Sequence, residues 1–96
     1  MEKAFLAFDA EVSKEPYCRD TGTTSCVVLI TPDEIYCANA GDSRAVLKTG
    51  DKAVPLSLDH KPDLPGERNR ISVAGHAVQM SRVDGNLALS RAFGDF

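Results

Sequence analysis

The sequence is poor in several kinds of residue on which common functions depend. It has no tryptophan, 6% aromatic residues and 2 histidines, too few for a metal site built from histidine. No cluster of lysine and arginine stands out, and the formal net charge is -3, so we expect neither nucleic acid nor a membrane surface as a partner. No apolar run is longer than Cys26–Ile30, which is far too short to span a bilayer.

The cysteine pattern argues against a disulfide framework and a structural zinc site. Cys18, Cys26 and Cys37 are odd in number and lack the Cys-x-x-Cys spacing. Cys26 and Cys37 lie in strand-like runs, where cysteine behaves as a small buried apolar residue. Cys18 has no histidine near it in the sequence, so a cysteine nucleophile is not expected. With no long apolar leader after Met1, we expect a reducing compartment, cytoplasmic or nuclear.

The hydrophobic pattern predicts an α+β fold. Apolar residues at helical spacing predict a helix over Met1–Val12, and Glu67–Ala74 with Gly75 as its stop predicts a short second one. Turn residues such as Asp84-Gly85 predict antiparallel hairpins joined mostly into a β-meander. The expected strands are Thr23–Thr31, Glu34–Ala40, Ala45–Lys48, Lys52–Leu58, His76–Val83 and Asn86–Leu89.

Several features predict that the chain is part of a larger domain. Cys26–Ile30 is apolar at every position, which is typical of a strand covered on both faces, and one or two helices cannot supply both covers. A helix starting at Met1 without a capping residue, and a Gly94–Phe96 end without a closing element, agree with this interpretation. We therefore expect marginal stability for the chain alone.

A break in the strand pattern at Gly41–Arg44, called the kink below, is the feature around which the chain is organised. Glycine and aspartate are disfavoured inside strands, so Gly41-Asp42 indicates a bulge or a sharp bend. Bulges often redirect a side chain beside an active site, which makes Asp42 the most interesting carboxylate of the chain. Spacing alone favours a simpler alternative, a hairpin turn with a solvated aspartate.

Loop carboxylates are the remaining candidates for metal chemistry, because the sequence has no glycine-rich phosphate loop, His-Glu-x-x-His or Gly-x-Ser-x-Gly motif. Clustered carboxylates suit Mg²⁺ or Mn²⁺. The candidates are five loop aspartates, and a simpler structural role is predicted for all of them except Asp42. Asp84 forms a turn, Asp63 helps to start the second helix, Asp59 accepts backbone hydrogen bonds, and Asp95 caps a helix end or turn. Asp42 is the hardest to explain in this way.

The basic residues are expected to be structural. An arginine beside a strand either pairs with a carboxylate or binds a phosphate, and pairing is the safer prediction for Arg44, Arg82 and Arg91. Arg68 and Arg70 are expected to be exposed on the surface of the second helix.

A series of short motifs follows one another along the chain. They are, in order, Gly22-Thr23-Thr24-Ser25, Ala40-Gly41-Asp42-Ser43-Arg44, Asp59-His60-Lys61-Pro62, Glu67 with Arg70-Ile71, Ala74-Gly75, Arg82-Val83-Asp84-Gly85 and Leu89-Ser90-Arg91-Ala92-Phe93-Gly94-Asp95. This series closely resembles the type 2C, metal-dependent protein serine/threonine phosphatases. The resemblance covers roughly Thr21–Phe96, and several motifs in the right order make it far more specific than any single one. His76 departs from the pattern, because a glycine is more usual at that position.

The resemblance implies part of an α-β-β-α sandwich, in which antiparallel sheets are flanked by helices and two metals, Mg²⁺ or Mn²⁺, lie where the sheets meet. It implies that a metal-activated water hydrolyses phosphoserine or phosphothreonine in a phosphorylated protein substrate. Of the family's metal ligands only Asp42 matches, at a position associated with a further, more weakly held metal. No catalytic or other cofactor-binding residue is carried over.

On this resemblance, residues 1–96 are expected to be a partial phosphatase domain whose N- and C-terminal parts are missing, nearly inactive by itself. Two alternatives stay open. One is a non-catalytic, phosphatase-like interaction module or truncated pseudo-phosphatase that binds partners through uncovered strands. The other is a composite site completed by another chain. The sequence does not predict the oligomeric state.

Overall fold

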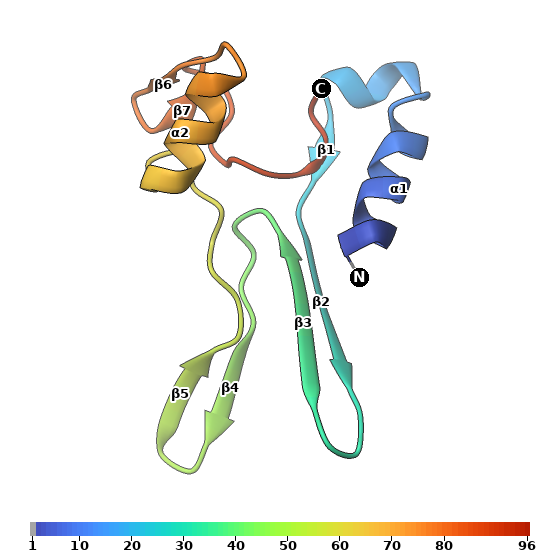
Figure 1. The fold of residues 1–96 in the computed structure, drawn as a ribbon, viewed down its shortest axis with the longest axis vertical. Coiled ribbons are helices and arrows are strands. Elements are labelled where there is room, and N and C mark those ends of the chain that lie inside the picture. The colour runs from blue at the N-terminus through green and yellow to red at the C-terminus, as the bar shows by residue number, and fades with distance from the viewer. Residues whose placement is uncertain (1) are drawn as a thin grey trace.

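A computed structural model describes residues 2–96 and contains two α-helices and four antiparallel strand pairs (Figure 1). The predicted α+β class is therefore confirmed. The helices are α1 (Glu2–Val12), a 3-10 helix η1 (Pro16–Arg19) and α2 (Pro65–Val73). The strands are β1 (Gly22–Thr23), β2 (Ser25–Ile30), β3 (Ile35–Ala40), β4 (Val46–Thr49), β5 (Lys52–Pro55), β6 (Val78–Gln79), β7 (Arg82–Val83) and β8 (Phe93–Gly94).

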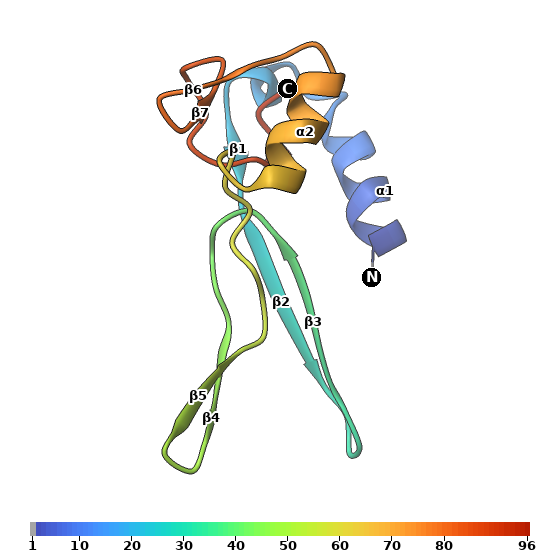
Figure 2. The ribbon, with the colours of Figure 1, turned by 60° about the vertical axis from the view of Figure 1, so that its left-hand side comes forward.

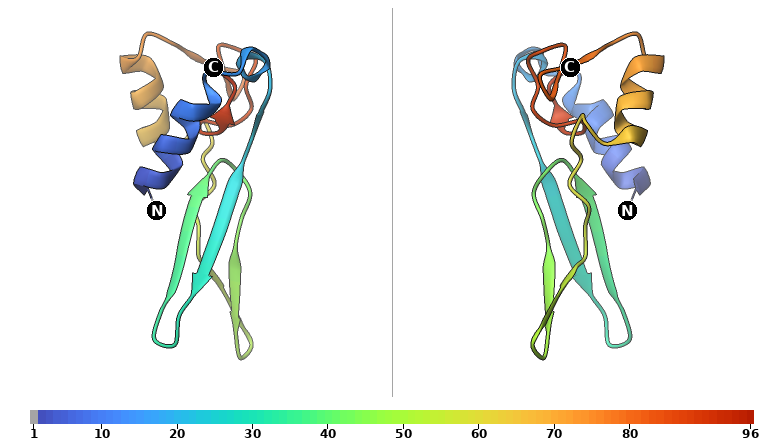
Figure 3. Two further views of the ribbon diagram at one scale, coloured as in Figure 1. Left: turned by 90° about the vertical axis from the view of Figure 1, so that its right-hand side faces the viewer. Right: turned by 90° about the vertical axis from the view of Figure 1, so that its left-hand side faces the viewer.

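The strands form four separate antiparallel pairs, three of them hairpins, instead of one continuous sheet. β2 pairs with β3, β4 with β5, β6 with β7, and β1 with β8 near the end of the chain. β3 and β4 are not paired, because the kink between them sends the chain in a new direction. Figures 1 and 2 show the two long hairpins diverging from one end of the molecule, and the side views of Figure 3 place both helices at that same end.

A small aromatic core joins the first helix to the last strand. Phe5 and Phe8 of α1 each pack edge-on against Phe93 of β8, with ring centroids 5.1 Å apart in both pairs. The Asp9 carboxylate accepts a hydrogen bond from the Gly94 backbone N–H at 3.0 Å. These contacts use the apolar stripe that the sequence predicts for this helix. Within residues 2–96, no helix is long and apolar enough to cross a bilayer.

The half of the β2–β3 hairpin toward its turn is uncovered on both faces within residues 2–96. Val27, Val28, Leu29 and Ile30 are between 42% and 73% exposed, and successive strand residues point to opposite faces. The radius of gyration is 15.1 Å, against about 12.5 Å for a closed domain of this length. The prediction that this apolar strand lacks covering layers is confirmed for the part of the chain that the structure describes.

The cysteines are free thiols, as expected. Cys26 and Cys37 lie on neighbouring strands with their Sγ atoms 4.0 Å apart, and both are half-buried rather than fully buried. Their burial is limited because the neighbouring residues toward the turn of the hairpin are exposed.

The hairpin predicted over His76–Leu89 turns at a different place from the one expected, so this prediction is wrong. The hairpin reverses at Met80-Ser81, whose φ angles are +53° and +63°, so β6 and β7 both fall within the single strand expected. Asp84-Gly85 forms a second tight turn that leads to one bridge from Val83 to Leu87 instead of a return strand. The chain reverses at Met80-Ser81 because the Asp84 N–H donates to the Ala77 carbonyl, which closes the loop between these two residues.

The end of α2 is as predicted and its beginning is not. Gly75 has φ +91°, and the N–H groups of Gly75 and His76 donate to the carbonyls of Ser72 and Ile71, a left-handed helix end for which glycine is suited. His76 therefore leaves this turn intact. The helix begins at Pro65, and the Asp63 carboxylate pairs with Arg68 at 2.9 Å instead of capping the first turn.

Candidate functional site

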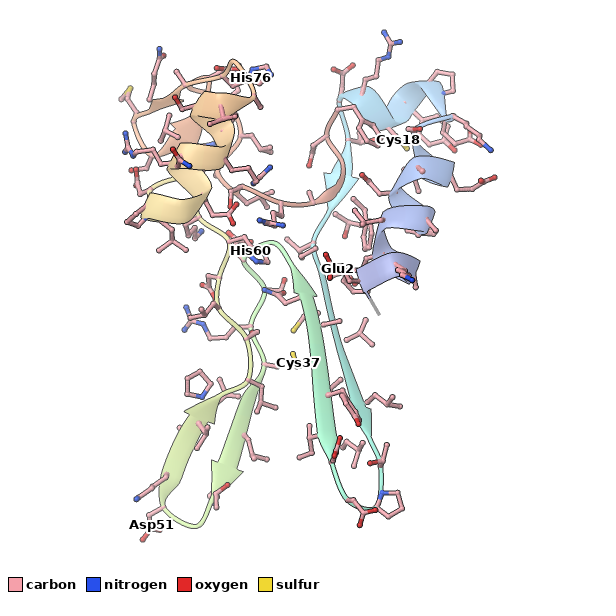
Figure 4. The ribbon with its side chains drawn as sticks, in the orientation of Figure 1. Glu2, Cys18, Cys37, Asp51, His60 and His76 are labelled. Atoms are coloured by element: carbon pink, nitrogen blue, oxygen red, sulfur yellow. The ribbon has the colours of Figure 1, made fainter. Side chains whose placement is uncertain are left out.

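Two hydrogen bonds join the kink to the loop before α2. The Gly41 N–H donates to Nδ1 of His60 at 3.0 Å, and the His60 N–H donates to the Gly41 carbonyl at 2.8 Å. The Asn39 amide adds donations to the carbonyls of Gly41 and Leu58. Figure 4 shows His60 where the hairpins meet the helical end, far from His76 beyond α2. The kink is a bend braced by a distant loop, so the hairpin-turn alternative is wrong.

Only glycine fits at the bend. Gly41 is buried and has φ +113°, a conformation that residues with a side chain rarely adopt. A Cβ at this position would lie 2.5 Å from Cγ2 of Thr24 and 3.1 Å from the Arg91 carbonyl oxygen. The backbones of three segments therefore approach each other closely here.

Asp42 leaves the bend beside Lys61. Its Oδ2 accepts a charge-assisted hydrogen bond from the Lys61 ammonium at 2.6 Å, and the Asp42 side chain is 29% exposed. The next residue, Ser43, shares a hydrogen bond of 2.7 Å with the Thr24 hydroxyl. Asp42 thus reaches the surface at a fixed place, with a lysine as its counter-ion.

Arg44 pairs with Asp59, so the prediction that this arginine pairs with a carboxylate is confirmed. Nε and Nη2 of Arg44 donate to the two carboxylate oxygens at 2.9 and 2.7 Å. Hydrogen bonding from Arg44 holds the pKa of Asp59 below its usual value, even though partial burial of the carboxyl acts in the opposite direction. The predicted role of Asp59 as an acceptor for backbone groups is therefore replaced by an ion pair.

A buried carboxylate that sequence reasoning missed supports the kink from α2. The Glu67 side chain is 11% exposed and accepts hydrogen bonds from Nε of Arg91 at 3.1 and 3.3 Å and from Arg70 at 2.9 Å. Arg70 also donates to the Ser90 carbonyl at 2.5 Å, and the Ser90 N–H donates to the His60 carbonyl at 3.1 Å. Arg70 is therefore more than a surface solubiliser. Its i, i+3 spacing from Glu67 was the available signal.

The charge states follow from these contacts. Burial by itself raises the pKa of Glu67, but hydrogen bonds from Arg91 and Arg70 outweigh it and bring the pKa down to about 2. Burial lowers the pKa of His60, and the nearby Arg91 charge lowers it further. At neutral pH Glu67 is a carboxylate and His60 is neutral, with Nδ1 as a hydrogen-bond acceptor for Gly41.

The remaining candidate residues lie elsewhere or are already paired. Asp84 accepts hydrogen bonds from the Ala77 N–H and shares one with Nδ1 of His76, which keeps its predicted role in a turn. Asp95 lies over Gly22, in the β1–β8 region, and Arg82 donates to the backbone.

The described residues do not fit a metal pair. Within residues 2–96, no three histidine, cysteine or acidic side chains come together as a metal-binding group. Asp42 offers a hard oxygen donor at the surface, and its nearest charged neighbour is a cation, Lys61. The prediction that Asp42 is a metal ligand therefore stays a prediction.

Comparison with known proteins shows the protein family that this chain matches. The family description "Protein phosphatase 2C" matches residues 1–96. A protein phosphatase 2C homolog of Hypocrea jecorina is 51% identical over 98 residues, covering all of this chain and 22% of the relative. Protein phosphatase 2C homolog 3 of Schizosaccharomyces pombe is 57% identical over 98 residues, covering all of this chain and 24% of the relative.

A solved structure agrees. The crystal structure of a phosphatase from a pathogenic strain of Toxoplasma gondii superposes with a TM-score of 0.71 at 30% identity, over 97% of this chain and 45% of that one. The chain belongs to the protein phosphatase 2C family. It spans about a quarter of the length of the curated relatives it matches, since a probable protein phosphatase 2C of Caenorhabditis elegans, 51% identical, is covered over 28%.

Replacing Gly41 by alanine tests the bend. Because the new Cβ would strike Thr24 and the backbone would be forced out of its left-handed conformation, we expect Gly41→Ala to lower the free energy of unfolding by at least about 2 kcal/mol. Gly50→Ala is the control, because Gly50 also has positive φ but open space around it, and should cost about 1 kcal/mol. Equal losses in urea unfolding would show that close packing at Gly41 does not matter.

Acid unfolding tests the Glu67 network. The pKa of folded Glu67, about 2, lies below the ordinary value of 4.5, so its contribution is present above pH 4.5 and is lost as the pH falls toward 2. We expect it to be about 3 kcal/mol at neutral pH. Glu67→Gln should flatten the fall in stability over this range, whereas Glu11→Gln, on the exposed face of α1, should not. Equal acid sensitivity of Glu67→Gln and the unsubstituted protein would contradict the ion-pair network.

Proposed function

We propose that the protein containing this chain is a metal-dependent protein phosphatase that hydrolyses phosphoserine and phosphothreonine in proteins. The observation that supports this most directly is the family match across residues 1–96. Members of the family are generally metal-dependent, and in such sites bound metal ions activate a water molecule and neutralise charge on phosphoryl oxygens. We propose Mg²⁺ or Mn²⁺ as the ion.

Asp42 is the residue of this chain that we propose as a metal ligand. Three observations support this assignment. The Asp42 carboxylate is partly exposed, and it follows directly on the bend at Gly41. The residues on either side of Asp42 are held by hydrogen bonds, Gly41 to His60 and Ser43 to Thr24. We assign it an outer position, at the edge of a site whose other ligands lie outside residues 1–96. In this proposal residues 1–96 form the middle of a longer phosphatase domain, whose other parts cover the β2–β3 hairpin.

The non-catalytic alternative has no specific observation in its favour. An exposed apolar hairpin fits a partner-binding module, but it fits equally well with a domain whose covering layers are supplied by other segments of the same protein. We also propose the cytoplasm or nucleus as the compartment, on the free thiols alone.

The direct test is phosphatase activity in the full-length protein. With a phosphothreonine peptide and Mn²⁺, Asp42→Ala should lower turnover by about tenfold or more, because a ligand of a metal that supports catalysis is lost. Asp33→Ala, in the turn between β2 and β3, is the matched control and should keep full activity.

Residues 1–96 alone should show almost no turnover. A full-length protein without phosphatase activity would overturn the proposed function. Undiminished activity of Asp42→Ala, or strong activity of the 96-residue chain, would instead show that the site is misplaced.

A further inference from the structure

Two of the three free thiols meet on one face of the β2–β3 hairpin. Cys26 lies opposite Asn39 in the strand register, and Cys37 lies two positions before Asn39, so both cysteine side chains point to the same face. Their Sγ atoms are 4.0 Å apart, close enough for a weak S–H···S contact. Cys18 lies apart from them, in η1 at the helical end of the molecule (Figure 4).

We propose that Cys26 and Cys37 are a redox-sensitive thiol pair, which a hydroperoxide such as hydrogen peroxide joins into a reversible disulfide between β2 and β3. The inference does not depend on the proposed function, because it uses only the chemistry and geometry of the hairpin. In a reducing compartment, a disulfide of this kind is transient and serves to sense oxidants.

The reaction has two steps and needs no other reactant. One sulfur, as its thiolate, attacks the O–O bond of hydrogen peroxide and becomes a sulfenic acid, and the first water is released. The second sulfur then attacks the first, the S–S bond forms, and the sulfenic oxygen leaves as a second water. Two electrons pass from the sulfurs to the peroxide, and both thiol protons end in the water molecules.

The two thiols do not ionise independently. Burial raises the pKa of the Cys37 thiol, and the hydrogen bond and charge of Cys26 raise it further. A second thiolate beside the first is therefore disfavoured, and the reactive state has one thiolate and one protonated sulfur. This state suits the reaction, because the thiolate takes up the oxygen and its neighbour supplies the proton with which that oxygen leaves. Since the thiolate is the nucleophile, the reaction speeds up as the pH rises.

An open cavity beside Cys37 admits the oxidant. It measures about 360 Å³ and is lined by Asn39, His60 and residues 55–58, at the end of β5 and beyond it. Several molecules of the size of water fit into such a volume. The cavity lies at the half of the hairpin near the kink, not at the apolar half toward the turn, which we assign above to covering segments.

The position of the two cysteines favours a disulfide that is easily reduced. Residues diagonal to each other in an antiparallel pair have Cα atoms about 7–8 Å apart, which is beyond the usual span of a disulfide. Bond formation therefore requires side-chain rotation and a small shift of the strands, and strained disulfides are the ones that cellular thiols reduce. Asn39 stands opposite Cys26. Its amide donates to the carbonyls of Gly41 and Leu58, so the shift reaches the kink.

The test is peroxide treatment of the native full-length protein, followed by unfolding, alkylation of the remaining thiols and mass spectrometry. Trypsin cuts after Arg19 and Arg44 and nowhere between them, so residues 20–44 carry both cysteines of the pair without Cys18. We expect this peptide to lose both alkylation sites and to become lighter than the reduced peptide by two hydrogen atoms. Reduced glutathione should restore both sites. Raising the pH by about one unit should speed the loss by up to about tenfold, because more thiolate is present.

Two single substitutions serve as controls. Cys18→Ser should form the disulfide in the same way as the unsubstituted protein. In Cys26→Ala, the loss of alkylation at Cys37 that glutathione reverses should disappear, because the partner sulfur is gone. The result on the unsubstituted protein stands even if circular dichroism shows that Cys26→Ala does not fold.

Three results would overturn the proposal. The first is full alkylation of both cysteines at a peroxide dose that oxidises all the free glutathione in a parallel sample. The second is a sulfinic acid, or a bond to another cysteine, in place of the disulfide within residues 20–44. The third is an unchanged, reversible loss of alkylation at Cys37 in Cys26→Ala. Because all these readouts are masses, they do not depend on whether the protein is an active phosphatase.

Discussion

The reciprocal hydrogen bonds between Gly41 and His60 are the constraint on which the site depends. They join residues 19 positions apart and bring the end of β3 against the loop that leads into α2. These hydrogen bonds hold the two long hairpins together at one end, since β3 and β4 are not paired with each other. Asp42 and Lys61 meet as a direct consequence, since each is the next residue after one member of the pair.

An ion-pair network centred on Glu67 of α2 also supports the Gly41–His60 contact. Glu67 is a buried charge, which is costly unless it is paired and fully hydrogen-bonded, and Arg70 and Arg91 meet both needs. Through the Ser90 backbone this network reaches the His60 carbonyl. The same arrangement keeps His60 neutral, because burial and the Arg91 charge both lower its pKa. A neutral imidazole is what the Gly41 N–H requires as its acceptor.

The sequence predicts the parts that depend on near neighbours. The helix at the start of the chain, the β2–β3 hairpin and the glycine stop of α2 were predictable from local patterns. A break at Gly41-Asp42 was predicted too, but spacing alone favoured a hairpin turn over the bend that the structure has there. Contacts between distant residues were not. The Glu67–Arg91 pair spans 24 positions, and neither residue is unusual in its own segment. The Met80-Ser81 reversal was also missed, because neither residue favours a positive φ as glycine, asparagine and aspartate do, and a hydrogen bond between Ala77 and Asp84 imposes it.

The protonation state of His60 is the most direct measure of this account. A long-range ¹H–¹⁵N NMR spectrum of the histidine rings at neutral pH distinguishes the two neutral tautomers and the charged form. The structure predicts a neutral ring with its proton on Nε2 and a bare Nδ1 that accepts from Gly41, persisting below the pH at which an ordinary histidine protonates. A proton on Nδ1, or an ordinary titration, would contradict the claim that this hydrogen bond organises the site.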